Sequence, residues 1–271
     1  EGDEPMFTQP LMYKTISEHP TTSSIYAEKL VAEGIMKPEE TRQVVDDRIA
    51  YLDTEFDAGT NYRPNKADWL EGSWSGMSTA HGIERRGDTA VELETLRKIG
   101  ETMTTVPEHM TLNPKLTRIV ETRAARIRDG VGIDWATAEH LAFGALLLEG
   151  DPVRLSGQDS CRGTFSQRHA VLVDQATEER YVPLSHLSEG QGMFEVIDSP
   201  LSEASVMGFE YGFSQAEPNA LVMWEAQFGD FANGAQVVID QFISSAESKW
   251  LRMNALVLLL PHGYECQGHE H

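Results

Sequence analysis

Four short apolar segments in the second half of the chain constrain its fold more than any other feature of the sequence. They are 153–156, 194–197, 220–224 and 255–260, with amphipathic helical stretches at 202–214 and 232–245 between the later ones. Apolar strands that alternate with helices are typical of a parallel sheet with right-handed crossovers. The second half of the chain is therefore predicted to be an α/β fold, with helices on both faces of a parallel sheet.

Each of these strand candidates runs directly into a polar loop. The loops are 157–160, 198–203, 225–231 and 261–265, and all four contain a carboxylate. Ligands bind to open parallel sheets in the crevice beyond the carboxyl ends of the strands. The loops therefore predict a ligand site at one edge of the sheet.

The first half of the chain is predicted to be mainly helical. Apolar periodicity predicts helices over 22–33, 37–56, 90–101 and 114–128, and a further helix over 134–148 that Gly150 and Pro152 stop. A crossing loop is expected over 54–68 and an extended connector over 72–87, because both segments lack a clear period.

The composition excludes several classes of protein. The net charge of −21 argues against a nucleic-acid partner and against an anionic membrane surface, since both need a basic face. The longest apolar run, 255–260, is far shorter than a membrane span, and two cysteines are too few for a disulfide framework. No phosphate loop, Gly-x-Ser-x-Gly turn, His-Glu-x-x-His motif or dinucleotide fingerprint occurs.

Three residues of the predicted strand-end loops are candidates for chemistry. Glu203 stands at a strand-to-helix turn, where it either complements the helix dipole or serves as a carboxylate of the ligand site. Phe228 and Phe231 are three residues apart in a Gly-Asp turn. They either pack in the core or bind a planar heterocycle.

The histidines and arginines of the second half leave further alternatives. His262, His269 and His271 follow the last strand candidate, where a hydrogen bond to an anionic substrate is favoured over a metal site. A basic stretch contains Arg162, Arg168 and His169, for which structural ion pairing is favoured.

At these positions the sequence resembles the thiamine-diphosphate-dependent decarboxylating component of 2-oxoglutarate dehydrogenase. The resemblance is carried by residues 1–5, 8–14, 154–160, 162–165, 199–203, 208–212, 224–236 and 260–265. It covers nearly the whole chain and is most specific from Asp134 onward. The chain departs from the family at Cys266 and His269, where Gly and Pro are usual.

The resemblance implies a domain layout and an enzyme. Residues 1–15 would be the tail of a pyrophosphate-binding domain, 16–130 a helical connector, and 131–271 a pyrimidine-binding domain that continues beyond the C-terminal end. The cofactors would be thiamine diphosphate and Mg²⁺, with the metal ligands in the part of the protein that precedes this chain. No metal ligand is assigned within it.

The resemblance also implies roles for individual residues. Glu203 would be catalytic, bonding the aminopyrimidine ring and favouring the imino tautomer that removes the thiazolium proton. Phe228 would stack on the pyrimidine with Phe231 beside it. His271 would contact the 2-oxo acid and would also be catalytic.

The implied function is oxidative decarboxylation of 2-oxoglutarate with succinyl transfer to lipoyl-lysine in the tricarboxylic acid cycle. The implied partners are a second copy of the enzyme, the lipoyl-bearing succinyltransferase and dihydrolipoyl dehydrogenase. The expected location is the bacterial cytoplasm, or the mitochondrial matrix in a eukaryote. Two alternatives stay open: a non-catalytic dimerisation or interaction fragment, and the same chemistry on 2-oxoadipate.

Overall fold

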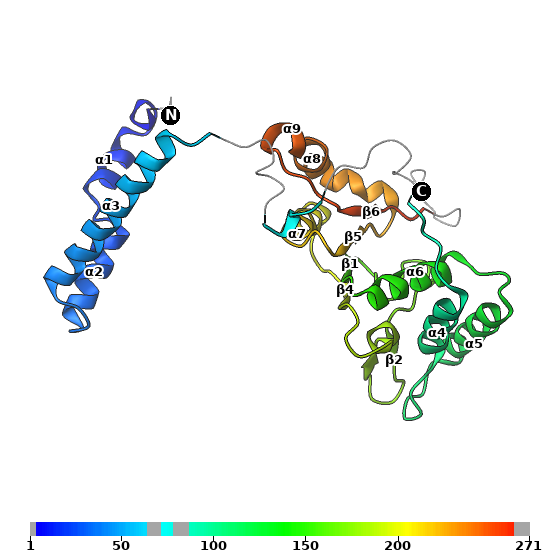
Figure 1. Ribbon diagram of the computed structural model, residues 1–271. Helices are drawn as coiled ribbons and strands as arrows, with labels where there is room; N and C mark the ends of the chain where they lie inside the picture. Colours follow the sequence, from blue (N-terminus) through cyan, green and yellow to red (C-terminus); the bar gives the residue numbers. More distant parts are fainter. Residues whose placement is uncertain (1–3, 64–71, 78–86, 263–271) are drawn as a thin grey trace. The chain divides into compact units, whose positions relative to one another are not determined.

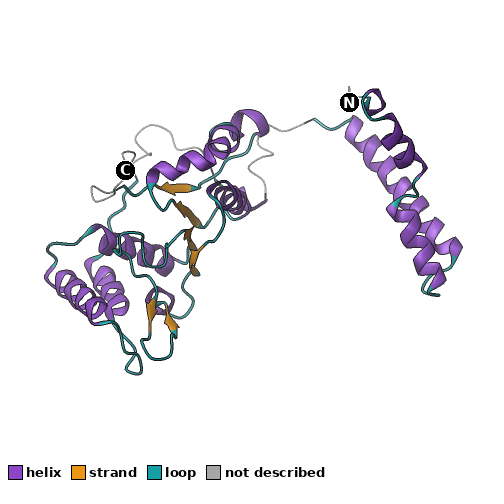
Figure 2. Cartoon of the chain, turned by 180° about the vertical axis from the view of Figure 1, so that it is seen from behind, coloured by secondary structure: helices purple, strands orange, loops and turns teal. Residues whose placement is uncertain are grey.

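The computed structural model describes residues 4–63, 72–77 and 87–262, and the chain divides into two compact units at Asn65 (Figures 1 and 2). The first unit is Glu1–Asn65 and the second is Lys66–His271. The boundaries predicted at residues 15 and 130 came from the resemblance to a family. They remain predictions.

The first unit consists of helices, as predicted. It contains the short 3₁₀ turn η1 (Pro5–Phe7) and the helices α1 (Pro10–Glu18), α2 (Thr22–Ala32) and α3 (Pro38–Thr60). The Thr21 hydroxyl accepts a hydrogen bond from the Ser24 N–H at the start of α2, and the Glu40 carboxylate accepts one from the Lys37 N–H at the start of α3. None of these helices contains a buried residue.

The loop predicted over 54–68 is wrong in its first part. Helix α3 continues to Thr60, because no proline interrupts the segment and a helix adds one hydrogen bond for each further residue. Residues 64–68 lie outside the described residues. Of the connector predicted over 72–87, Gly72–Trp74 forms the 3₁₀ turn η3, and 78–86 lie outside the described residues.

Three helices open the second unit, and local sequence sets their ends. They are α4 (Leu93–Thr104), α5 (Pro114–Asp129) and α6 (Trp135–Glu149). The Asn113 side chain caps α5, and the Asp134 carboxylate caps α6 by accepting a hydrogen bond of 2.8 Å from the Thr137 N–H. Helix α6 ends at Gly150, whose left-handed backbone with φ of 97° favours glycine.

The four predicted strands form one parallel sheet, as expected. They are β1 (Val153–Gly157), β4 (Phe194–Asp198), β5 (Leu221–Glu225) and β6 (Val257–Leu259), in the order β4-β1-β5-β6. The chain passes from β1 to β4 on one side and then returns to β5 on the other side. Strand β1 is therefore the point where the direction of winding reverses, and ligands bind beside such a point.

Helices cover both faces of the sheet, as Figure 1 shows and as the fold prediction requires. On one face, Met223 of β5 belongs to a core that includes Leu147 of α6 and Ile99 of α4. On the other face, the adjacent Trp224 packs with Met207 of α7 (Glu203–Ala216). Successive side chains of a strand point to opposite faces, so β5 is buried on both sides.

A small antiparallel hairpin was not predicted from the sequence. Strands β2 (Leu172–Val173) and β3 (Arg180–Tyr181) have two residues each, and the 3₁₀ turn η5 (Pro183–His186) follows them. The Asp174 carboxylate organises the turn by accepting hydrogen bonds from the N–H groups of Ala176 and Thr177. The hydrogen bond from the Thr111 N–H, followed by those from Thr177 and Ala176, holds the pKa of Asp174 well below its usual range.

The helix predicted over 232–245 is irregular in the structure. The segment consists of the 3₁₀ helix η6 (Gly229–Ala235), α8 (Gln236–Val238) and the π-helical turn η7 (Ile239–Ile243), and α9 (Ala246–Trp250) follows. The first residue of η6 is tied to the segment that follows β6, since the Gly229 N–H donates to the Pro261 carbonyl at 2.8 Å. No helix of the described residues is both long and apolar enough to span a bilayer.

A buried ion-pair triad joins α6 to β5 and confirms the ion pairing predicted for Arg168 of the basic stretch. The Arg168 guanidinium lies between the carboxylates of Glu139 and Glu225. Burial lowers the pKa of Arg168, but hydrogen bonds to Glu225 and Glu139 outweigh it and raise that pKa above its ordinary value.

Replacement of Arg168 by Met should destabilise the protein by about 3–5 kcal/mol, because Glu225 would stay buried without its partner. The measurement is the free energy of unfolding in urea. Arg162→Met is the matched control: Arg162 pairs with Asp159 at the surface, and its loss should cost less than about 1 kcal/mol. Equal effects of the two substitutions would contradict the structural role of the triad.

His140 of α6 is a second buried titratable group. Its Nδ1–H donates to the Ala136 carbonyl at 2.8 Å, and burial lowers the pKa of His140 from 6.5 to about 3. The unfolded chain therefore binds a proton near pH 6.5 that the folded chain excludes, so stability falls as the pH falls below 6.5.

The expected loss from His140 between pH 7 and pH 4 is on the order of 3 kcal/mol. His140→Gln keeps an N–H donor but does not titrate, so its stability should depend less on pH in this range. The comparison is made by urea unfolding at both pH values. If the two proteins lose the same stability, His140 is not buried in its neutral form.

Candidate functional site

The carboxyl ends of the four parallel strands lie level with one another. The register pairs Gly157 of β1 with Asp198 of β4 and Glu225 of β5, and it pairs Glu225 with Leu259 of β6. The four polar loops therefore start from one line across the sheet. This arrangement confirms the predicted gathering of the loops at one edge.

Hydrogen bonds tie neighbouring loops together. The Asp198 carboxylate accepts from the Cys161 N–H at 2.8 Å, and the Ser199 N–H donates to the Gly157 carbonyl at 2.8 Å. Burial, with the negative charge of Asp198 close by, raises the pKa of the Cys161 thiol to about 11. Cys161 is therefore a neutral thiol at physiological pH and not a nucleophile.

Glu203 is the first residue of α7 and lies half-buried at this edge. Its position complements the helix dipole, and its carboxylate also faces other loops of the edge. Gln158 Nε2, in the loop after β1, donates to Glu203 Oε1 at 3.5 Å. A Cβ built on Gly234 of η6 would lie 3.4 Å from Glu203 Oε2, so η6 approaches the carboxylate closely at this glycine.

Phe228 and Phe231 lie at the start of η6 and in contact with each other. Phe228 is the N-cap residue of η6, and the two ring centroids are 5.7 Å apart in an edge-to-face arrangement. Phe231 is 37% exposed and Phe228 is half-buried, so neither ring is in the core. The alternative that they are core residues is therefore wrong, and the pair forms a partly exposed aromatic surface.

A third ring, Phe165, extends this surface. It comes from the loop that follows β1, is 40% exposed, and lies edge-on to Phe228 with a centroid distance of 5.8 Å. No pattern in the sequence marks a role for Phe165. Its position in a polar loop rich in arginine and serine offered no periodicity that could mark it as part of an aromatic row.

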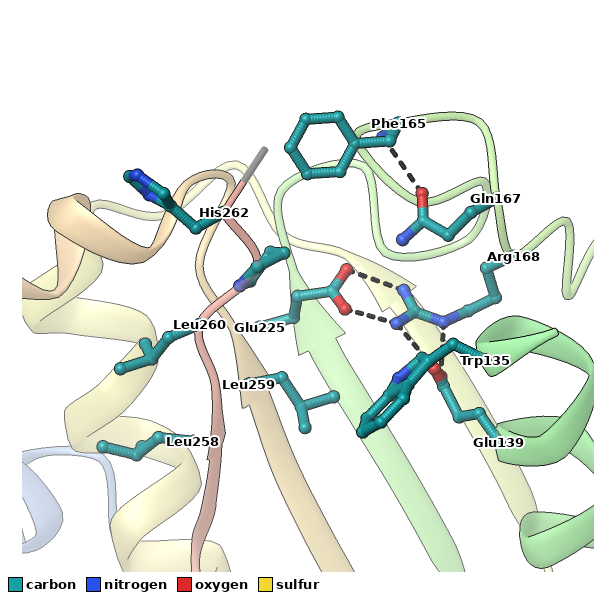
Figure 3. Close-up of a pocket in the computed structure, with 11 residues that line it drawn as sticks. Trp135, Glu139, Phe165, Gln167, Arg168, Glu225, Leu258, Leu259, Leu260 and His262 are labelled. Carbon is teal, nitrogen blue, oxygen red and sulfur yellow. Dashed lines mark hydrogen bonds and ion pairs between the residues drawn. The ribbon is translucent and has the colours of Figure 1, made fainter. Parts of the chain in front are cut away.

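Phe165, Phe228 and Phe231 together are called the aromatic row. A cavity of about 420 Å³ lies next to this row (Figure 3). Figure 3 shows Phe165 and His262 near the ends of the strands, with the Arg168–Glu225 ion pair below them. Trp135 of α6 and Leu259 of β6 supply apolar walls. Glu203 and Phe228 do not line this cavity, so the carboxylate and the cavity are neighbouring features of one sheet edge.

The predicted histidines are only partly covered by the structure. His262 lines the cavity, whereas His269 and His271 lie outside the described residues. In the described part of the chain, no three His, Cys, Asp or Glu side chains are grouped so that they could hold a metal ion.

The second half of the chain matches a known protein family. Residues 131–271, about half of the chain, match the family described as "Transketolase, pyrimidine binding domain". The chain belongs to the transketolase pyrimidine-binding domain family. Membership implies thiamine diphosphate as the cofactor, and it places Glu203, Phe165 and the aromatic pair within the matching residues.

The chain is also similar to several bacterial proteins that have the same description. The chain is 59% identical over 273 aligned residues to the 2-oxoglutarate dehydrogenase E1 component of Brucella anthropi, and 57% identical to that of Brucella canis. The corresponding protein of Brucella melitensis is 56% identical. The alignments cover 100% of this chain but 27% of each relative.

Gly157 lies where the end of β1 closely approaches β5, so a substitution there tests the pairing of the strand ends. A Cβ built on Gly157 would overlap with the carbonyl oxygen of Glu225, and its φ of 154° is unfavourable for other residues. Gly157→Ala should destabilise the protein by roughly 1–3 kcal/mol, because β1 and β5 would have to separate.

Gly208→Ala is the matched control for Gly157→Ala. Nothing lies within 4 Å of a Cβ on Gly208 in the middle of α7, so this substitution should stabilise the protein by about 0.5–1 kcal/mol. In thermal unfolding, the melting temperature should fall for Gly157→Ala and rise for Gly208→Ala. A neutral Gly157→Ala would mean that β1 and β5 are not in such close contact.

Proposed function

We propose that this chain supplies the aminopyrimidine-binding half of a thiamine diphosphate site in a 2-oxoglutarate dehydrogenase E1 component. The observation that carries the proposal is the half-buried Glu203 carboxylate at the first turn of α7, at the carboxyl edge of the sheet. Family membership supports the cofactor, and the Brucella relatives support the substrate.

The residues of the edge fit an aminopyrimidine ring. Gly234 lies next to the Glu203 carboxylate, and η6 joins Gly234 to the half-buried ring of Phe228. A protonated heterocycle binds well to two kinds of group. A carboxylate accepts a hydrogen bond from its N–H, and an aromatic ring stacks on its plane. In this proposal Glu203 and Phe228 hold the ring, with Phe231 beside it.

Glu203 would act on a proton rather than on the substrate. When bound, thiamine diphosphate supplies the carbon nucleophile that attacks a 2-oxo group. The Glu203 carboxylate accepts a hydrogen bond from the ring nitrogen and stabilises the protonated form of the ring. Gln158 is within 3.5 Å of the opposite carboxylate oxygen and steadies its orientation. His271 is proposed to contact the 2-oxo acid.

The whole protein is proposed to decarboxylate 2-oxoglutarate oxidatively and to transfer the succinyl group to lipoyl-lysine. It would act as a homodimer in a complex with the lipoyl-bearing succinyltransferase and dihydrolipoyl dehydrogenase. Mg²⁺ would be held by residues outside this chain. The bacterial relatives favour a location in the cytoplasm.

Glu203→Gln in the full-length protein tests the proposal. Turnover of 2-oxoglutarate should fall by at least about 100-fold, since an amide cannot stabilise the protonated ring as a carboxylate does. The melting temperature should change little, because the lost dipole interaction is worth only about 0.3–1 kcal/mol. Turnover is measured with an artificial electron acceptor, with 2-oxoadipate as the competing substrate.

Glu94→Gln is the matched control, because Glu94 also occupies the first turn of a helix, α4, but lies exposed and away from the edge. It should keep full turnover. Normal turnover by Glu203→Gln would overturn the role of Glu203. A preference of the parent protein for 2-oxoadipate would correct the substrate but leave the site unchanged.

A further inference from the structure

Helix α5 carries a buried arginine outside the residues that match the family. Arg123 is 6% exposed, and its side chain donates from Nη1 to the Arg168 carbonyl at 2.9 Å and from Nη2 to the Gln167 carbonyl. Its Nε has no hydrogen-bond partner within the part of the chain that the structure describes. Burial lowers the pKa of Arg123, against the attraction of Asp134 and Glu139.

Such a residue destabilises the fold unless it is well paired, because burial removes its charge from water. An apolar side chain of similar volume would fill the same space at a lower cost. What an apolar side chain cannot do is bind two successive backbone carbonyls. The specific effect of Arg123 is therefore on the segment that carries those carbonyls.

That segment, residues 163–169, has a backbone that needs external support. Ser166 and His169 adopt left-handed conformations with φ of 55° and 52°, which are unfavourable for residues other than glycine. The Gln167 side chain folds back and accepts a hydrogen bond from the Phe165 N–H at 3.0 Å (Figure 3). Position 163 has a φ of 83°, which favours glycine, and a Cβ there would displace the Gln167 amide from its present place.

Phe165 connects this segment to the proposed cofactor surface. Its backbone N–H is held by Gln167, and its ring lies edge-on to Phe228, which in turn contacts Phe231. A continuous series of contacts thus runs from Arg123 through Gln167 and Phe165 to Phe228. Because Phe165 is 40% exposed, packing alone does not determine where its ring lies.

We propose that Arg123 is a positioning residue: through the segment 163–169 it holds Phe165 against Phe228 and so fixes the aromatic surface that stacks on the aminopyrimidine. The inference rests on the proposed function. It makes α5 part of the cofactor site, although α5 lies outside the residues that match the family. Lysine cannot replace Arg123 fully, since its single ammonium lacks the planar fork that reaches both carbonyls.

The test uses the full-length protein with Arg123→Met, Phe165→Ala and the double variant. The dissociation constant of thiamine diphosphate at saturating Mg²⁺ is measured by calorimetry. Each single variant should bind the cofactor about tenfold more weakly, and the double variant also about tenfold, because both changes break the same series of contacts. Arg123→Lys should recover part of the loss, while kcat at saturating cofactor should change less than the affinity.

Arg118→Met is the matched control, because Arg118 is an exposed arginine on the same helix. It should leave the affinity unchanged. The inference is overturned if Arg123→Met binds the cofactor within about twofold of the parent, or if the double variant shows the product of the single losses. A purely structural arginine would lower the melting temperature without this pattern. If Arg123→Met does not fold, Arg123→Lys replaces it in the same cycle, where a smaller loss of affinity that the double variant does not increase supports the inference and an unchanged affinity overturns it.

Phe228→Ala separates failure of the inference from failure of the proposed function. If Phe228→Ala leaves cofactor binding unchanged, Phe228 does not stack on the cofactor, and the proposed function is wrong at this residue. If Phe228→Ala weakens binding while Arg123→Met and Phe165→Ala do not, the cofactor site stands and only the positioning role of Arg123 is wrong.

Discussion

The carboxyl edge of the sheet depends on one buried cation. Arg168 lies on the loop after β1, pairs with Glu139 of α6 and Glu225 of β5, and donates to the Ser160 carbonyl at 3.0 Å. Three parts of the fold therefore meet at one guanidinium. Because a buried charge is tolerated only with its partners in place, the loop, the helix and the strand end can adopt few other arrangements.

This constraint makes the edge suitable for binding. The four strands end level with one another, so the loops begin at fixed positions. Hydrogen bonds from Cys161 to Asp198 and from Gly229 to Pro261 then hold neighbouring loops together. Glu203 and the aromatic row then lie on short segments fixed at both ends. A site built this way loses little conformational freedom when it binds a planar ligand.

Several elements could be predicted because their signals are local. Asp134 as N-cap and Gly150 at the end define α6, and the apolar runs of β1 and β5 are bounded by turn residues. The hairpin of β2 and β3 could not be predicted, because strands of two residues have no period to detect. The π-helical turn η7 departs from the α-helix expected over 232–245, and its Ile239 and Ile243 pack against the core that contains Trp224.

The sequence by itself determined the parallel sheet, the carboxylate-bearing loops at its edge and the family, and it singled out Glu203, Phe228 and Phe231. Each of these depends on residues close together in the chain or on a specific motif. Only the tertiary structure decided that Arg168 is buried with Glu225, 57 residues away, and that Arg123 binds the carbonyl of Arg168, 45 residues away. It also decided that Phe165 joins the aromatic row. Contacts between residues so far apart leave no local pattern, since they exist only after the helices and the sheet have packed together.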